Sequence, residues 1–117
     1  MKQNAFAIIV DDEKDIGTLL SAFLKNAGFT VKYAESLSEA EVIIQENNLK
    51  LALLDINLPD GSGFDLVDAL RKNNPNVKII VQSAYNGPEE KEKLDYHQLE
   101  HFLPKPINLT ELKKLVS

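Results

Sequence analysis

An alternation of short apolar runs with segments of helical periodicity is the feature that most constrains the fold of this chain. Residues 6–10 and 51–54 are continuous apolar runs, each ended abruptly by an aspartate, as expected of strands buried on both faces of a parallel sheet. Between them, apolar residues recur at helical spacing from Ile16 to Ala27 and stop at Gly28, a residue that commonly ends helices. The chain therefore starts with a strand followed by a helix.

The pattern repeats to the end of the chain and predicts five strands and five helices in all. The remaining strands are expected at 29–34, 77–81 and 101–103. The remaining helices are expected from a capping-box pattern at Ser38–Glu41, after the turn 58–63, across Pro88–His97, and from a cap that Asn108 forms with Glu111. Right-handed crossovers place such helices on both faces of a single parallel sheet, so the fold class is α/β.

The length and composition of the chain exclude several classes of function. With 117 residues, of which 44% are hydrophobic and 26% charged, the chain is expected to form one domain spanning residues 1–117. The formal net charge is −5 and the basic residues are scattered, so no direct nucleic-acid contact is expected. The absence of cysteine excludes disulfides, thiolate metal sites and thiol nucleophiles. No apolar run approaches the roughly 20 residues of a membrane span, and residues 1–5 lack a signal-peptide pattern, so no membrane contact and a cytoplasmic location are expected.

Five polar residues occupy equivalent positions in the predicted sheet. Each of them follows the carboxyl end of a strand: Asp11, Asp12, Asp55, Ser83 and Lys105. Sites in open parallel sheets lie beyond these ends, where the strand order reverses. Carboxylates about 5 Å apart repel by roughly 3 kcal/mol per pair at an effective dielectric constant of about 20, so the acids need a compensating cation. Each residue alone could be a helix cap or a loop residue, but their shared position predicts a site.

The residue types at this edge point to phosphoryl chemistry assisted by a metal ion. Oxygen ligands without Cys or His select a hard cation, and Mg²⁺ suits because it keeps positions open for water and phosphate. A carboxylate nucleophile can attack phosphorus and form an acyl phosphate when cations neutralise the equatorial oxygens. Mg²⁺ would supply one such charge and Lys105 another, and the Ser83 hydroxyl can donate a hydrogen bond to a phosphoryl oxygen.

Four segments resemble the signature blocks of bacterial response-regulator receiver domains: Val10–Glu13, Leu53–Gly61, Ser83–Ala84 and Phe102–Pro106. They occur in the order and spacing of the family and cover nearly the whole chain. The resemblance implies a signalling domain of a two-component system rather than an enzyme, one that assists its own phosphorylation and dephosphorylation. It also implies a flavodoxin-like sheet with the strand order 2-1-3-4-5.

The resemblance assigns roles to individual residues. Asp55 would be the phosphoacceptor and, with Asp12 and the backbone carbonyl of Asn57, a direct ligand of Mg²⁺. Asp11 would assist through water, and Lys105 would contact the phosphoryl group.

A switch and a set of partners follow from the same resemblance. Ser83 would be the conserved hydroxyl of the family and Phe102 its aromatic switch residue, acting on a surface of the fourth helix, fifth strand and fifth helix. The partners would be a histidine kinase or phosphotransfer protein and an unidentified effector domain or protein, and a phosphorylation-dependent homodimer is compatible with this scheme. The Lys105–Pro106 bond is predicted to be cis, because the chain must leave the fifth strand sharply.

The fourth helix and the segment after it depart from the family pattern. Residues 89–93 are all charged and offer few apolar side chains for packing, so this helix is expected to be short or mobile. Many receivers have a small Gly-Ala pair where this chain has His97–Gln98, and the helix begins with Gly87–Pro88, so an unusual output face is predicted. The last helix stops at Ser117, short for the family, which suggests trimming or a piece of a longer regulator.

Other interpretations of the same residues remain open. A phosphohydrolase of the haloacid dehalogenase type also uses an aspartyl nucleophile and Mg²⁺, but Asn57 stands where that class has a second, proton-exchanging Asp. A pseudo-receiver would fold without being phosphorylated, although every expected site position is filled. A flavodoxin would need a phosphate loop rich in Ser, Thr and Gly after the first strand, where this chain is acidic. His97 and His101 have the i, i+4 spacing of metal ligands but straddle a predicted helix–strand junction, which favours exposed histidines.

Overall fold

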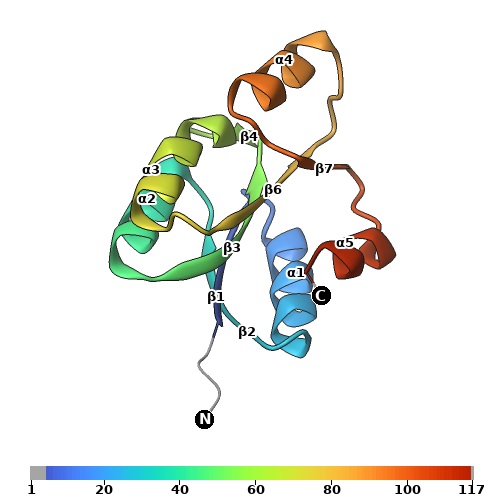
Figure 1. Cartoon of the computed structure of the whole chain (residues 1–117). Coiled ribbons are helices and arrows are strands. Elements are labelled where there is room, and N and C mark those ends of the chain that lie inside the picture. The colour runs from blue at the N-terminus through green and yellow to red at the C-terminus, as the bar shows by residue number, and fades with distance from the viewer. Residues whose placement is uncertain (1–4, 117) are drawn as a thin grey trace.

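The computed structural model describes residues 5–116 and contains a five-stranded parallel sheet. The strands lie in the order β2-β1-β3-β6-β7 (Figure 1). Their bounds are β1 Ala5–Val10, β2 Phe29–Ala34, β3 Leu49–Asp55, β6 Lys78–Ser83 and β7 His101–Pro104. Counted along the chain as five strands, this is the order 2-1-3-4-5, so the predicted fold is confirmed. The expectation that residues 1–5 contain no signal peptide concerns mainly residues 1–4, which lie outside the described residues. Ser117, where the last helix is expected to stop, lies outside them as well.

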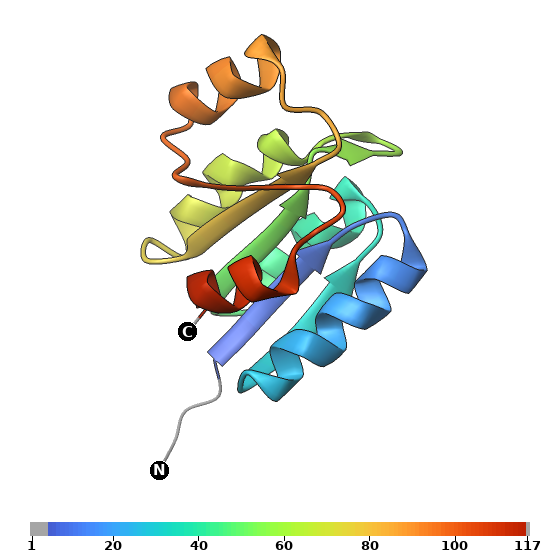
Figure 2. The same ribbon diagram turned by 90° about the vertical axis from the view of Figure 1, so that its right-hand side faces the viewer.

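Helices cover both faces of the sheet (Figures 1 and 2). On one face, α1 and α5 contribute Leu24 and Leu112 to a buried apolar cluster, and on the other, α2 and α3 contribute Ile44 and Leu70 to a second cluster. The bounds are α1 Lys14–Asn26, α2 Leu37–Glu46, α3 Val67–Asn73, α4 Pro88–Tyr96 and α5 Leu109–Val116. Among residues 5–116, no helix has both the length and the apolar character needed to cross a bilayer.

The central strands read as continuous apolar runs because both of their faces are buried. In β1, Ile8 and Val10 belong to the cluster beneath α2 and α3, whereas Ala7 and Ile9 belong to the cluster beneath α1 and α5. All four side chains are fully buried. Burial of a large aliphatic side chain contributes roughly 1.5–3 kcal/mol, so the two clusters fix both the sheet and its helices.

A short antiparallel ribbon follows β3 and lies outside the predicted elements. It pairs β4 (Asn57–Leu58) with β5 (Gly61–Ser62) and leads into a 3₁₀ helix, η1 (Gly63–Leu66), that precedes α3. Two-residue strands carry no periodicity, so the sequence shows this segment only as a turn.

Helix α2 begins earlier than predicted. The sequence contains two overlapping Ser-x-x-Glu patterns, and the prediction that Ser38–Glu41 is the capping box is wrong. The Ser36 hydroxyl accepts a hydrogen bond from the Glu39 amide at 3.2 Å, and the Glu39 carboxylate accepts one from the Glu35 amide, also at 3.2 Å. Starting the helix at Leu37 places this buried leucine on the same face as Ala40 and Ile44, so packing selects the first pattern.

Two other predicted helix ends are confirmed. After α1, Gly28 has φ 101°, a left-handed conformation that glycine adopts without steric cost. Before α5, the Asn108 side-chain oxygen accepts hydrogen bonds from the Thr110 and Glu111 amides at 2.9 and 3.1 Å. These bonds satisfy amides that the helix itself leaves unpaired.

Helix α4 is attached to the rest of the domain at its C-terminal end. No residue of the helix is buried, as the charged run 89–93 predicts. The His97 ring stacks on Phe64 with a centroid distance of 5.7 Å. The Arg71 guanidinium donates hydrogen bonds to the carbonyls of His97 and Gln98, and Gln98 has φ 54°. At the position where many receivers have a Gly-Ala pair, His97 and Gln98 therefore attach the helix through a ring stack and through hydrogen bonds from Arg71.

Asp60 ties the turn of the β4–β5 ribbon to the start of α2. Its Oδ1 accepts from the Leu37 amide at 2.8 Å, and its Oδ2 accepts from the Ser38 amide at 3.2 Å. The bond to the Leu37 amide is the largest cause that lowers the pKa of Asp60, and a smaller effect of burial opposes it. The carboxylate thus caps α2 from a distant part of the sequence.

We expect Asp60→Asn to lower the melting temperature (Tm) at neutral pH, because a neutral amide with one acceptor oxygen replaces a charged, two-oxygen cap. The pKa of Asp60 is lower in the folded than in the unfolded state, so its contribution is complete above the ordinary value of 3.8 and is lost as the pH falls through the folded value. The Tm difference from the wild type should therefore narrow below about pH 4. Thermal unfolding followed by circular dichroism measures this, and a pH-independent difference would contradict it. Asp65→Asn, at an exposed position nearby, is the control.

Candidate functional site

The carboxyl ends of four strands meet at one edge of the sheet, where the predicted site residues lie. The strand register sets Asp55 beside Gln82 and Ser83 beside Pro104. Residues 11–12 follow directly after β1, and Lys105 follows directly after β7. The position that the sequence predicts for these residues is therefore the position that they occupy.

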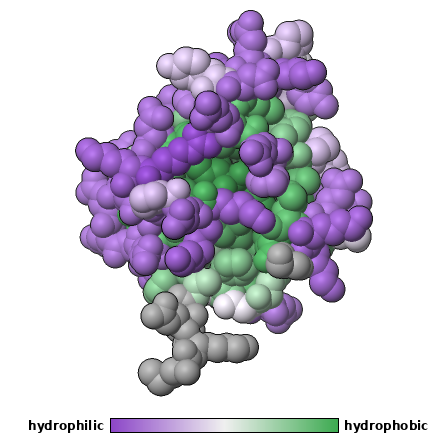
Figure 3. Space-filling model, viewed as in Figure 1, coloured by the Kyte–Doolittle hydropathy of each residue, from purple (hydrophilic) through white to green (hydrophobic). Residues whose placement is uncertain are grey.

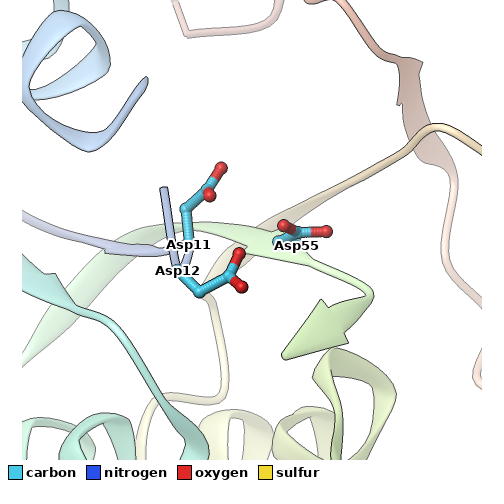
Figure 4. Close-up of side chains that lie close together, drawn as sticks. All are labelled: Asp11, Asp12 and Asp55. Atoms are coloured by element: carbon cyan, nitrogen blue, oxygen red, sulfur yellow. The ribbon is translucent and has the colours of Figure 1, made fainter. Parts of the chain in front are cut away.

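Three aspartates form a compact cluster (Figure 4). Asp11, Asp12 and Asp55 each offer one carboxylate oxygen, and these oxygens lie within 4.8 Å of one another. Asp11 is 0% and Asp55 2% exposed, whereas Asp12 is exposed to solvent. Oxygen donors without Cys or His, open to water on one side, suit a hard divalent cation. The cluster could therefore hold a metal ion.

Lys105 places its ammonium group among the acids. Nζ lies 2.7 Å from Asp55 Oδ2, 3.6 Å from Asp11 Oδ2 and 3.8 Å from Glu13 Oε1. Burial by itself lowers the pKa of Lys105, but the hydrogen bond to Asp55 and the charges of the three acids together raise it above the ordinary value. The backbone N–H of Lys105 donates to the Ser83 carbonyl at 2.9 Å. The Lys105–Pro106 bond is cis, as predicted.

Several hydrogen bonds hold Asp11 in place, but burial still makes the negative charge of its carboxylate unfavourable. Its Oδ1 accepts from the Glu13 amide at 2.9 Å, its Oδ2 accepts from Gln82 Nε2 at 3.1 Å, and its carbonyl accepts from the Tyr33 hydroxyl at 2.6 Å. Burial is the largest effect on the carboxyl group and raises the pKa of Asp11. The Glu13 amide and Lys105 lower this pKa, but they do not offset burial and the repulsion from Asp55.

The loop after Asp55 folds tightly over the end of β3. The Gly63 N–H donates to the Ile56 carbonyl at 2.9 Å, and a Cβ atom at Gly63 would lie 2.1 Å from the Asp55 carbonyl oxygen. Only glycine fits there, because any side chain would overlap the backbone of β3. The Asn57 N–H donates to Asp55 Oδ1 at 3.1 Å. One oxygen of Asp55 is thus held by the backbone and the other by Lys105.

The two predicted switch residues lie on neighbouring strands and contact different surroundings. Ser83 is 1% exposed, and its Oγ accepts a hydrogen bond from the Tyr85 amide at 2.9 Å. Phe102 is half-buried and packs against the apolar cluster beneath α2 and α3. It also lines a surface groove of about 290 Å³ together with Leu94 and Gly87 of the α4 region. Phe102 therefore contacts the core and α4 rather than the acids.

A larger groove of about 460 Å³ opens beside Lys105. Apolar side chains of α1 and of the segment that leads into α5 line it, among them Ile16, Leu19, Leu20, Ile107 and Leu109. Figure 3 shows apolar surface in the middle of the face that Figure 1 presents, bordered by hydrophilic side chains. Leu19 is 52% exposed, so the groove continues onto the outer surface of α1.

Three further side chains contact the site and were not predicted. Glu13 pairs with Lys105, Tyr33 donates to the Asp11 carbonyl, and Gln82 donates to the Asp11 carboxylate. Gln82 could have been found, because it is a polar residue in a strand that is otherwise apolar at Ile79–Val81. Tyr33 comes from the edge strand β2, and no local pattern marks it.

The order of the motifs and the geometry of the acids agree with a comparison against protein families. A family described as "Response regulator receiver domain" matches residues 7–117. The chain belongs to this family. As a receiver domain it is a member of a family of signalling domains, and the predicted resemblance is confirmed.

Individual relatives extend this result. The response regulator protein PilR of Pseudomonas aeruginosa is 33% identical over 111 residues, which are 95% of this chain and 25% of PilR. The chemotaxis protein CheY4 of Vibrio cholerae has a TM-score of 0.87 and 28% identity, with 97% of each chain covered. A beryllofluoride-activated NtrC4 receiver domain dimer has a TM-score of 0.84 and 30% identity, with 95% of this chain and 92% of that chain covered. This receiver domain spans less than half the length of the curated relatives compared with it.

We expect Asp11→Asn to raise the Tm of the receiver domain at neutral pH in the presence of a chelator, because it removes a buried charge that Asp55 repels. The folded-state pKa of Asp11 lies above its ordinary value of 3.8, so its favourable contribution exists below 3.8 and is lost as the pH rises through the folded value. The advantage of the variant should therefore grow with pH. Differential scanning fluorimetry across this range measures it. Asp12→Asn, at the exposed position, should have a smaller effect, and a less stable Asp11→Asn at neutral pH would contradict the argument.

Proposed function

We propose that residues 1–117 form the phosphoacceptor domain of a two-component system, which takes a phosphoryl group from a histidine kinase or phosphotransfer protein onto Asp55 with Mg²⁺. The resulting change would control an effector through the surface of α4, β7 and α5. The observation that carries the proposal is the environment of Asp55. Asp55 is 2% exposed, and its carboxylate contacts Lys105 Nζ at 2.7 Å and has an oxygen within 4.8 Å of two further acids.

The proposed reaction transfers one phosphoryl group from a nitrogen or oxygen atom of the donor to a carboxylate oxygen of Asp55. A carboxylate oxygen of Asp55 forms a bond to phosphorus, while the bond from phosphorus to the donor atom breaks. The electron pair of that bond leaves with the donor, an imidazole nitrogen of a phosphohistidine or an acetate oxygen of acetyl phosphate. The Lys105 ammonium stabilises charge on the phosphoryl oxygens, and the Ser83 hydroxyl donates to one of them.

The acidic cluster fits Mg²⁺ by the type and exposure of its donors. In this proposal Asp12, Asp55 and the Asn57 carbonyl bind the cation directly, and Asp11 binds through water. When bound, the cation supplies the charge that allows three carboxylates and a phosphoryl group to lie together. The exposure of Asp12 supports this assignment, because Mg²⁺ retains several water molecules.

A phosphohydrolase of the haloacid dehalogenase type is not favoured. Asn57 stands two residues after Asp55, and its amide cannot exchange a proton as the second aspartate of that class does. Membership of the receiver family also supports a signalling role over turnover of a substrate. A pseudo-receiver is not favoured either, because each expected site position is filled.

The partners in this proposal come from the family and from the surface of the domain. The apolar groove beside Lys105 supports contact with the protein that donates the phosphoryl group. The matched region makes up only 25% of PilR, which supports an effector domain or protein as the recipient of the signal. The NtrC4 receiver dimer supports a homodimer formed on phosphorylation. The net charge of −5 argues against direct contact with nucleic acid. Control by a kinase, as proposed here, supports a cytoplasmic location.

We expect incubation with Mg²⁺ and acetyl phosphate to add one phosphoryl group to the wild-type chain and none to Asp55→Asn. The amide of the variant keeps the shape of the side chain but is a far weaker nucleophile. Intact-protein mass spectrometry measures the added mass, and a parallel reaction with chelator shows the dependence on the metal. Asp65→Asn, which leaves the cluster intact, should be phosphorylated like the wild type. Equal phosphorylation of Asp55→Asn would show that Asp55 is not the phosphoacceptor.

The output would run from Ser83 to Phe102 and the α4 region. A phosphoryl group on Asp55 adds acceptor oxygens that draw the Ser83 hydroxyl away from the Tyr85 amide. In the present structure Ser83 Oγ accepts a hydrogen bond from this amide at 2.9 Å. Movement of the Ser83 hydroxyl would leave space beside β6, and Phe102 of the neighbouring strand β7 could then rotate into it. Full burial of a Phe ring contributes roughly 1.5–3 kcal/mol, enough to bias a two-state surface.

We expect beryllofluoride with Mg²⁺ to change amide hydrogen exchange between Ser83 and Phe102. Segment Gly87–His97 should change most, because α4 has no buried residue. Mass spectrometry of peptides with and without the phosphate mimic measures this, and Asp55→Asn is the control. If protection changed only in the loops that carry the three aspartates, the output would not use this face.

A further inference from the structure

Gln82 is a buried polar residue at the end of an otherwise apolar strand. It follows Ile79–Val81 in β6 and is 0% exposed. The strand register sets it between Asp55 of β3 and Leu103 of β7. A neutral amide is therefore enclosed in the sheet next to the proposed phosphoacceptor.

The two ends of this amide have different surroundings. Nε2 donates a hydrogen bond to Asp11 Oδ2 at 3.1 Å. Oε1 is buried and has no hydrogen-bond partner among residues 5–116. A carboxylate only accepts hydrogen bonds, so the nitrogen must face Asp11, and turning the amide would place two acceptors against each other.

Packing alone does not account for a glutamine at this position. Strand alternation places residue 82 on the same face as Ile80, which belongs to the apolar cluster beneath α1 and α5. An aliphatic side chain of similar size would fill this space without burying an unpaired carbonyl oxygen, which costs stability. The hydrogen bond to Asp11 is the interaction that such a side chain would lose.

We infer that Gln82 is a positioning residue of the metal site, which holds the Asp11 carboxylate ready for the cation. The inference rests on the proposed function, because it assumes that the acidic cluster binds Mg²⁺. The Glu13 amide holds Asp11 Oδ1 and Gln82 holds Oδ2, so the carboxylate is fixed from both sides. In the proposed site Asp11 holds the cation through water, so Gln82 fixes an outer-shell partner of the metal. Loss of outer-shell contacts typically lowers metal affinity by about ten- to hundredfold.

Gln82 also limits the competition between Lys105 and the cation. Lys105 Nζ lies 3.6 Å from Asp11 Oδ2, the oxygen that accepts from Gln82, and 2.7 Å from Asp55 Oδ2. Without the Gln82 donor, Lys105 would be the other described side chain that contacts this oxygen, and it would be drawn toward Asp11. A cation entering the cluster would then have to displace a tighter ion pair.

Calorimetric titration of Mg²⁺ into the whole chain, first cleared of metal with a chelator, tests this role. Gln82→Met removes the donor and keeps an unbranched side chain, and Gln82→Leu is the second variant. Both should raise the dissociation constant for Mg²⁺ about tenfold or more. Gln45→Met, at an exposed position of α2, is the matched control and should leave it unchanged. The rise in Tm that Mg²⁺ causes should shrink in parallel in the two Gln82 variants.

Asp12→Ala separates failure of this inference from failure of the proposed function. If the wild type does not bind Mg²⁺, or Asp12→Ala binds it equally well, the proposed metal site fails and the inference fails with it. If Asp12→Ala loses binding while both Gln82 variants bind within about twofold of the wild type, the inference alone is overturned. A Gln82 variant that unfolds in chelator also overturns it, because packing would then be what requires the glutamine.

Discussion

The ion contacts of Lys105 hold together an edge of the sheet that would otherwise repel itself. Its ammonium group lies within 3.8 Å of carboxylates from Asp11, Glu13 and Asp55, and the raised pKa of Lys105 shows that these contacts outweigh its burial. Lys105 does not restore the ordinary pKa of Asp11, which burial and, to a smaller extent, the charge of Asp55 raise. One lysine therefore keeps the acids close enough to share a cation while leaving the cluster short of positive charge.

The positions of these groups follow from a sheet that is buried on both faces. Residues alternate between two apolar clusters along β1 and β3. Because these strands run parallel, the acids at their carboxyl ends lie at the same edge. The loop after β3 is then fixed by the close approach of Gly63 to the Asp55 carbonyl and by the contact of Asp60 with α2. Packing in the core and hydrogen bonds in the loops together place Asp55 with both of its oxygens held.

The five strands and the site acids could be predicted because each depends on neighbours in the sequence. Apolar runs that end at an acid mark the strands, and the shared strand ends bring the acids together. The start of α2 could not be chosen between two Ser-x-x-Glu patterns, because the packing of Leu37 decides between them. Gln82 could have been found as a polar residue at the end of an apolar strand, but no local pattern marks Tyr33, which reaches Asp11 from the edge strand β2.

The attachment of α4 at one end determines how this helix can move. The Phe64–His97 stack, the Lys93 ammonium 5.8 Å from the centre of the Phe64 ring and the Arg71 contacts all lie near its C-terminus. Pro88, at the opposite end, is exposed, and the loop before it leads back to Ser83. A helix that is held at one end can turn about that end, so the possible displacement of a residue increases with its distance from the attachment. This attachment would therefore allow α4 its largest displacements at Pro88, beside the loop that joins the helix to the acidic edge.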